Sequence, residues 1–137
     1  MATSPGTIRQ AAAIPIRSGK VCLVTSSSGK RWVVPKGCME LGKTAGELAL
    51  QEAWEEAGLV GILQPEPVGS YLYEKYGNEY FVTVFLLRVT SAAEDWPERQ
   101  LRQRAWLSPA EAVSRVEDRG LREILRAAVS DAAELGV

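Results

Sequence analysis

The chain opens with two short apolar runs that are separated by a turn signal. Residues 11–16 and 20–25 are rich in Ala, Val, Ile and Leu, and a Ser-Gly dipeptide stands between them. Short apolar runs on either side of such a dipeptide are typical of a β-hairpin. After a Ser-rich loop, residues 31–34 are expected to return as a strand, which Pro35 ends.

Residues 45–57 change to a helical pattern. Ala, Leu, Glu and Gln, which are good helix formers, dominate this segment. Thr44 and Glu47 match a capping box, in which each side chain satisfies a free amide at the helix start. Gly58 stands where a left-handed C-terminal cap is expected. These signals predict a helix over 45–57.

The two kinds of side chain on this helix separate on a helical wheel. Glu52, Glu55 and Glu56 fall within an arc of about 100°. A separate apolar stripe is formed by Ala49, Leu50, Ala53, Trp54 and Ala57. We expect the stripe to pack on a sheet while the three carboxylates face a cleft.

The second half of the chain predicts strands and then helices. Residues 68–75 and 80–89 indicate two strands around a Gly77-Asn78 turn, and residues 101–107 indicate another. Ser108 to Glu111 resembles a second capping box that starts a short helix. Apolar residues at helical spacing define a last helix that ends near Gly136.

This order of strands, helix, strands and helix predicts an α/β (α+β) fold in which helices pack on a mixed β-sheet. A chain of 137 residues fits one domain, here taken as 1–137. Residues 1–6 are small and polar, and they are expected to be flexible.

Composition excludes several classes of function. The net charge is −1, so no global field attracts nucleic acid or an anionic membrane. The chain has no histidine, which excludes zinc-finger and Ser-His-Asp chemistry. Its two cysteines belong to no metal-binding array, and no apolar stretch reaches membrane-spanning length. We therefore expect a cytoplasmic protein with no membrane or nucleic-acid partner; the oligomeric state is open.

The acidic arc of the helix has two interpretations. Glutamates on a helix usually form a solvated face. However, no Lys or Arg lies within 45–57 to offset them, and Mg²⁺ favours such oxygen ligands. The Pro35-Lys36-Gly37 turn that precedes the helix adds a lysine and accessible backbone amides, which suit a pyrophosphate. Together these features favour a metal-assisted phosphate site.

At this point the sequence resembles the Nudix hydrolases. Their box reads Gly, five residues, Glu, seven residues, then Arg-Glu-(apolar)-x-Glu-Glu-x-Gly-(apolar), and the segment from Gly37 to Leu59 keeps this spacing and the acidic core. The resemblance implies an α/β/α sandwich. Pieces such as Arg31-Trp32-Val33-Val34-Pro35 are most similar to the branch that acts on diphosphoinositol polyphosphates and diadenosine polyphosphates.

Two positions depart from the box. Lys43 replaces its first glutamate, and Gln51 replaces the arginine that orients the neighbouring glutamate in the family. Fewer metal ions, slower turnover or lost catalysis are the possible consequences. Glu40 is a candidate substitute ligand, whereas Glu47 is better explained as the capping partner of Thr44.

The resemblance also implies roles for individual residues. Glu52 and Glu56 would bind Mg²⁺ (or Mn²⁺), and Glu55 would take the proton from an attacking water. The substrate phosphates also need basic partners outside the helix: Arg9 and Arg104 lie in segments that resemble the family's, whereas Lys36 follows from the loop before the helix. Each of these cations is more often an ordinary surface charge. The candidate substrate-binding residues are Arg9, Arg31, Lys36, Gly37, Lys75 and Arg104.

The aromatic residues have structural and functional interpretations. Trp32, Trp54 and Trp106 are expected in the core and Trp96 outside it. The four tyrosines around the second hairpin either pack there or stack on a base of a nucleotide substrate.

The favoured function is a metal-dependent hydrolase that cleaves a phosphoanhydride bond in a phosphorylated small molecule. A diphosphoinositol polyphosphate or a diadenosine polyphosphate is the favoured substrate. The alternatives are a catalytically weakened module that binds a phosphorylated ligand, a pyrophosphatase for ADP-ribose or nucleoside triphosphates, and an interaction protein that docks through its acidic helix.

Overall fold

A computed structural model describes residues 6–134 and 136. Two strands lie at the centre of its β-sheet. These strands, the first and the seventh, lie side by side and parallel, and the order along the sheet is β3-β2-β1-β7-β5. β4 also pairs with β1, β6 with β7, and β8 with β2. The strands are β1 (Ile8–Arg17), β2 (Lys20–Thr25), β3 (Trp32–Val33), β4 (Lys36–Cys38), β5 (Leu59–Leu63), β6 (Gly69–Lys75), β7 (Asn78–Ala92) and β8 (Arg104–Leu107). The helices are α1 (Ala45–Ala57), α2 (Pro109–Arg115) and α3 (Arg119–Glu134).

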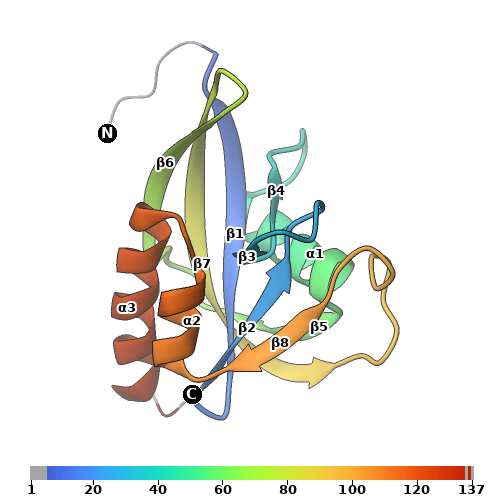
Figure 1. Cartoon of the computed structure of the whole chain (residues 1–137), viewed down its shortest axis with the longest axis vertical. Helices are drawn as coiled ribbons and strands as arrows, with labels where there is room; N and C mark the ends of the chain where they lie inside the picture. Colours follow the sequence, from blue (N-terminus) through green and yellow to red (C-terminus); the bar gives the residue numbers. More distant parts are fainter. Residues whose placement is uncertain (1–5, 135, 137) are drawn as a thin grey trace.

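The sheet is covered on both faces, which explains why β1 is apolar without interruption. Ala12 and Ile14 pack in one core with Leu125 of α3. Ala11 and Ala13 face the opposite core, which contains the buried residues of α1. Successive side chains of a strand point to opposite faces, so a strand buried on both faces is apolar at every position. Figure 1 shows α1 behind the sheet and α2 and α3 in front of it. The predicted α+β fold with a mixed sheet is confirmed.

Both predicted hairpins are present, and the second is shifted by one residue. β1 and β2 end at the pair Arg17 and Lys20, around a Ser-Gly turn with positive φ at both positions. β6 and β7 pair up to Lys75 and Asn78, so the turn residues are Tyr76 and Gly77 rather than Gly77 and Asn78. Tyr76 has φ 51° and Gly77 has φ 78°, which matches a two-residue hairpin turn.

Helix α1 has the predicted bounds and caps, and Ala49, Ala53 and Ala57 of its predicted apolar stripe are buried, but two other members of that stripe are not. The backbone amide of Glu47 donates to Thr44 Oγ1 (3.1 Å), and the amide of Thr44 donates to Glu47 Oε1 (2.8 Å). Leu50 and Trp54 are 37% and 39% exposed, whereas Leu48, which the wheel left out, is buried. The helix is therefore rotated so that small alanines and Leu48 face the sheet.

Other differences concern short or irregular segments. The sequence did not predict β4 and β5, and β8 begins at Arg104 rather than at Leu101, which is 68% exposed. Trp96 belongs to neither core, as expected, but it is partly buried, and its Nε1 donates to the Glu56 carbonyl (3.0 Å). α2 and α3 appear where they were expected.

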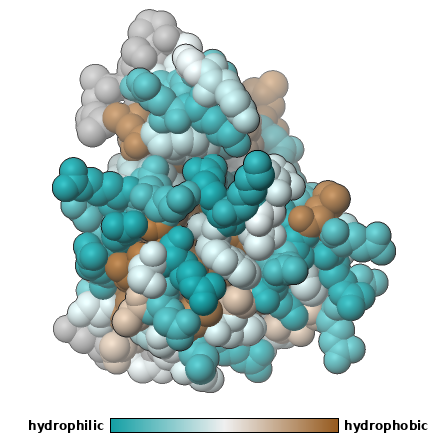
Figure 2. Space-filling view, in the orientation of Figure 1, coloured by the Kyte–Doolittle hydropathy of each residue, from teal (hydrophilic) through white to brown (hydrophobic). Residues whose placement is uncertain are grey.

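The outer surface in the orientation of Figure 1 is mostly hydrophilic, and apolar atoms show through in the region of α2 and α3 (Figure 2). In the part of the chain that the structure describes, no helix is both long and apolar enough to cross a membrane. Cys22 is buried, Cys38 is exposed, and both are free thiols. The flexible segment predicted at 1–6 lies outside the described residues apart from Gly6.

Candidate active site

Glu56 lies at the centre of the site and is almost fully buried, with 5% of its surface exposed. Helix α1 packs against β4, and this contact brings the backbone amide of Lys36 within 3.3 Å of Glu56 Oε1. The other carboxyl oxygen, Oε2, lies 3.6 Å from Nη2 of Arg102. Burial raises the pKa of Glu56, while Arg102 opposes that effect. The carboxyl group is thus fixed on two sides.

Glu52 lies against the backbone of Gly37. A Cβ atom at position 37 would come within 2.6 Å of the Glu52 side chain, so only glycine allows this approach. Burial, together with the neighbouring carboxyl groups of Glu55 and Glu56, raises the pKa of Glu52 to about 8. The structure therefore brings the three predicted carboxylates together, in a cluster that lacks positive charge around Glu52.

The carboxylate cluster has the donor atoms that a divalent metal requires. Among the described residues, no three Asp, Glu, Cys or His side chains already converge on one point. Mg²⁺, however, is commonly held by one or two carboxylates, with water and substrate phosphates as its other ligands. The crowded oxygens of Glu52 and Glu56, and the raised pKa of Glu52, match that chemistry. The donor set fits Mg²⁺.

Arg102 is a site residue that the sequence did not single out. Its side chain is 13% exposed, and besides Glu56 it contacts Glu98 (Nε to Oε1, 2.8 Å) and the carbonyl of Thr25 (Nη1 to O, 2.9 Å). Arg102 lies within residues 101–107, which were expected to form a strand, but β8 begins two residues after it. Glu98 and Arg102 are four residues apart, and this spacing could have indicated their ion pair from the sequence.

A cleft of about 230 Å³ opens beside Glu56, and we call it the basic cleft. Four cations line it, and Glu56 is the acid among its lining residues. Ser26, Ser27 and the aromatic ring of Tyr73 contribute to its wall. The four cations are Arg31, Lys36, Lys75 and Arg102. Three of the predicted phosphate ligands therefore come together, from the loop after β2, from β4 and from β6.

Lys36 is one of the enclosed cations of the basic cleft. Burial lowers its pKa, the charge of Glu56 opposes that effect, and Arg31, Lys75 and Arg102 lower the pKa further. Its Nζ lies 5.6 Å from the centre of the Tyr73 ring. An ammonium group that is enclosed and surrounded by like charges is stabilised when an anion enters the cleft.

Three other predicted residues lie outside the lining of the basic cleft. Arg9 is exposed, with its guanidinium 5.7 Å from the centre of the Phe81 ring. Arg104 donates from Nη1 to the Ala57 carbonyl (2.8 Å) and lies 4.3 Å above the Trp96 ring. Gly37 serves the approach of Glu52 described above.

The tyrosines of the second hairpin mostly contact one another. The rings of Tyr73 and Tyr80 stack at 4.7 Å, and the Tyr73 hydroxyl donates to Gln10 Oε1 (2.7 Å). Tyr71 is buried in the core, whereas Tyr76 is 91% exposed at the turn. Tyr73 and Tyr80 also line the basic cleft, so these two remain placed to contact a substrate.

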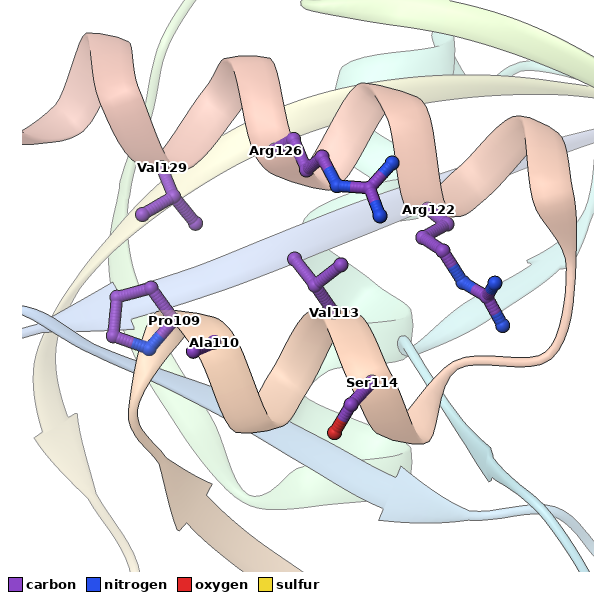
Figure 3. Close-up of a pocket in the computed structure, with 7 residues that line it drawn as sticks. All are labelled: Pro109, Ala110, Val113, Ser114, Arg122, Arg126 and Val129. Carbon is purple, nitrogen blue, oxygen red and sulfur yellow. The ribbon is translucent and has the colours of Figure 1, made fainter.

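A larger cavity, of about 650 Å³, lies between α2 and α3 (Figure 3). Val113 of α2 and Val129 of α3 both point into the space between the two helices, and Arg122 and Arg126 extend from α3 along it. None of the described residues that line it is a carboxylate, and α2 and α3 cover the face of the sheet opposite to α1. It is separate from the carboxylate cluster and the basic cleft.

The same fold occurs in proteins of known structure. The crystal structure of an Ap4A hydrolase from C. elegans matches with a TM-score of 0.74, at 19% identity, and the match covers 94% of this chain and 98% of that one. The fold that positions the glutamate cluster of α1 beside the basic cleft is thus one that is already known. The model of the NUDIX domain family matches residues 7–128, and the chain belongs to this family.

Curated relatives agree with this assignment. Nudix hydrolase 12, mitochondrial, from Arabidopsis thaliana is 38% identical over 119 residues, which cover 78% of this chain and 59% of the relative. Diphosphoinositol polyphosphate phosphohydrolase 3-beta from Bos taurus is 34% identical over 100 residues, which cover 71% of this chain and 60% of the relative. The chain thus spans less than two thirds of the length of either relative.

Proposed function

We propose that this protein is a metal-dependent hydrolase that cleaves a phosphoanhydride bond in a polyphosphorylated small molecule. One observation carries the proposal: the carboxylate cluster of α1 adjoins, through Glu56, a cleft lined by four cations. Carboxylates suit a divalent metal and cations suit phosphates, so the arrangement supports a metal site next to the phosphates of a substrate.

In this proposal, Glu52 and Glu56 hold Mg²⁺, for which Mn²⁺ can substitute, and Glu55 accepts the proton of the attacking water. The metal, when bound, would polarise a phosphoryl oxygen and lower the pKa of a bound water. Lys36 and Arg102 neutralise charge on the substrate near Glu56, while Arg31 and Lys75 hold phosphates farther along the basic cleft. Arg9, which lies outside the lining, would contact only a substrate that extends beyond it.

A substrate with several phosphates fits best, because cations from three separate segments surround one small cleft. We favour a diphosphoinositol polyphosphate or a diadenosine polyphosphate, in agreement with the names of one relative and one structural neighbour. ADP-ribose and nucleoside triphosphates are the next candidates. We also propose a cytoplasmic location, although five relatives are named as mitochondrial and one as chloroplastic.

The test is phosphate and nucleotide release from these four substrates with Mg²⁺, with Mn²⁺ and with chelator. We expect metal-dependent release, which Glu55→Gln lowers by about 100-fold or more because the general base is lost. Glu52→Gln and Glu56→Gln should mainly weaken the dependence on metal concentration. Glu66→Gln, an exposed glutamate on a loop, is the matched control and should behave like the unaltered protein.

One alternative has a specific observation in its favour. Lys43 and Gln51 depart from the Nudix box, as expected for a module that binds a phosphorylated ligand without cleaving it. Binding of the substrates without any metal-dependent release would support this module and contradict the hydrolase.

A further inference from the structure

The two departures from the Nudix box lie next to each other in space. A tight turn joins β4 to α1, in which the backbone amide of Lys43 donates to the Glu40 carbonyl (3.3 Å) and Gly42 has φ 82°. A positive φ at the third position is typical of a type II turn and favours glycine there. The turn brings the side chains of Glu40 and Lys43 to Gln51, one helical turn before Glu55.

Gln51 makes three side-chain contacts. Lys43 Nζ donates to Gln51 Oε1. On the other side of the amide, Gln51 Nε2 lies 3.3 Å from Glu55 Oε2 and 3.5 Å from Glu40 Oε2. The amide therefore links a cation on the surface to the carboxylate for which we propose the role of base.

The chemistry of these neighbours allows only one orientation of the amide. An ammonium group can only donate hydrogen bonds, and an ionised carboxylate can only accept them. Lys43 must therefore face the oxygen of Gln51, whereas Glu40 and Glu55 must face its nitrogen. If the amide were rotated by half a turn, Nε2 would face the Lys43 ammonium and Oε1 would face the two carboxylates. Neither arrangement allows a hydrogen bond.

We propose that Lys43 and Gln51 act together as positioning residues for Glu55. Lys43 fixes the orientation of the Gln51 amide, and Gln51 then holds the Glu55 carboxylate by a hydrogen bond. In this chain, a cation at position 43 and an amide at position 51 replace the acid and arginine of the box. This inference rests on the proposed function, because it assigns Glu55 the role of general base.

The inference predicts how single substitutions at these positions behave. Gln51→Glu keeps the size of the side chain but removes both donors and opposes Glu55 with a like charge. We expect kcat to fall by about 10-fold or more, with KM nearly unchanged, as for other residues that orient a catalytic group. Lys43→Glu should have a similar effect, because a carboxylate at position 43 attracts Nε2 and turns Oε1 toward Glu55.

A double-mutant cycle separates this role from a general disturbance. In Gln51→Arg the guanidinium can only donate, so it keeps a hydrogen bond to Glu55 whatever stands at position 43. We therefore expect Lys43→Glu to lower kcat about 10-fold beside Gln51, and by less than about 3-fold beside Arg at that position. Lys20→Ala and Gln100→Ala, both exposed and distant in sequence, serve as controls. Melting temperatures of all variants are measured alongside.

Each outcome decides something. Equal losses of kcat from Lys43→Glu in the two backgrounds would overturn the positioning role while leaving the hydrolase intact. A loss that follows the melting temperature across the series would also overturn it. Absence of metal-dependent turnover in the unaltered protein, in the panel described above, would overturn the hydrolase and this inference together.

Discussion

At the scale of single residues, the site depends on charges that are enclosed by distant parts of the chain. Arg102 joins Glu56 of α1, Glu98 of its own loop and the Thr25 carbonyl at the end of β2. A buried ion pair contributes little net stability as a pair, but removal of one partner leaves the other charge buried and unpaired. We therefore expect Arg102 to contribute more to the free energy of unfolding than an ordinary loop residue does.

The prediction compares Arg102→Met with Arg99→Met. The first change leaves Glu56 without its cation and should destabilise the protein by about 2–4 kcal/mol. Arg99 lies in the same loop, but its side chain is 58% exposed and its ion pair with Asp95 is 3.9 Å long, so the second change should cost less than about 0.5 kcal/mol. Urea denaturation measures both. Similar losses from the two variants would contradict the structural role of Arg102.

Residue identity and spacing predicted some of the site and could not predict the rest. Glu52, Glu55 and Glu56 were expected together because one helix carries them, and this is a local property. Arg102 and Arg104 could not be distinguished in the same way, because alternation has meaning only within a strand and β8 starts at Arg104. Which arginine turns toward Glu56 depends on the path of the preceding loop, and no local pattern records that path.

At the scale of elements, the signals for α1 were local and the signals for the short strands were not. The capping box and Gly58 gave both ends of α1, since each cap depends on residues within one helical turn. β4 has three residues, and it is a strand only because β1 offers it partners at Gln10, Ala11 and Ala12. The wheel placed Trp54 on the buried stripe because hydropathy alone does not give the rotation of the helix, which turns Leu48 and the alanines toward the sheet.

Gly58 combines two constraints, which a pair of variants can separate. Its φ is 68°, and a Cβ atom there would lie 2.9 Å from the Trp96 ring. Gly77 has a similar φ of 78°, but nothing lies within 4 Å of the corresponding position. Gly77→Ala should therefore cost about 1 kcal/mol for backbone strain alone, and Gly58→Ala should cost clearly more. Thermal denaturation gives the comparison, and equal costs would show that the Trp96 ring moves aside freely.

At the scale of the whole molecule, a net charge of −1 conceals a strong local separation of charge. The acidic cluster and the basic cleft adjoin at Glu56. The charges of the two regions therefore offset each other only near that residue. Around Glu52, negative charge is not balanced, which makes the stability of the metal-free protein depend on pH.

The direction of this dependence follows from the pKa of Glu52. Folding raises that pKa from an ordinary value of 4.5 to about 8, so the folded state binds the proton more tightly than the unfolded state does. The contribution of this proton to the free energy of unfolding is complete below pH 4.5, and it is lost as the pH rises toward about 8. In chelator, the melting temperature should fall over this range, and Glu52→Gln should flatten the fall.

Added Mg²⁺ should act in the opposite direction. A metal ligand must lose its proton, so Mg²⁺ should raise the melting temperature more near pH 8 than near about pH 5. An equal shift at both values, or an identical shift in Glu52→Gln, would contradict the role of Glu52 as a ligand.

The parallel pairing of β1 with β7 has a consequence for how the chain is made. Residues 8–16 leave the ribosome long before residues 80–88, which are their neighbours along most of their length. Until β7 emerges, the apolar faces of β1 and α1 lack the strand that completes their shared core. Closing so long a loop is entropically costly and slows folding. Synthesis itself therefore sets the earliest moment of folding, and a nascent chain that stalls before residue 78 should expose these surfaces to chaperones and proteases.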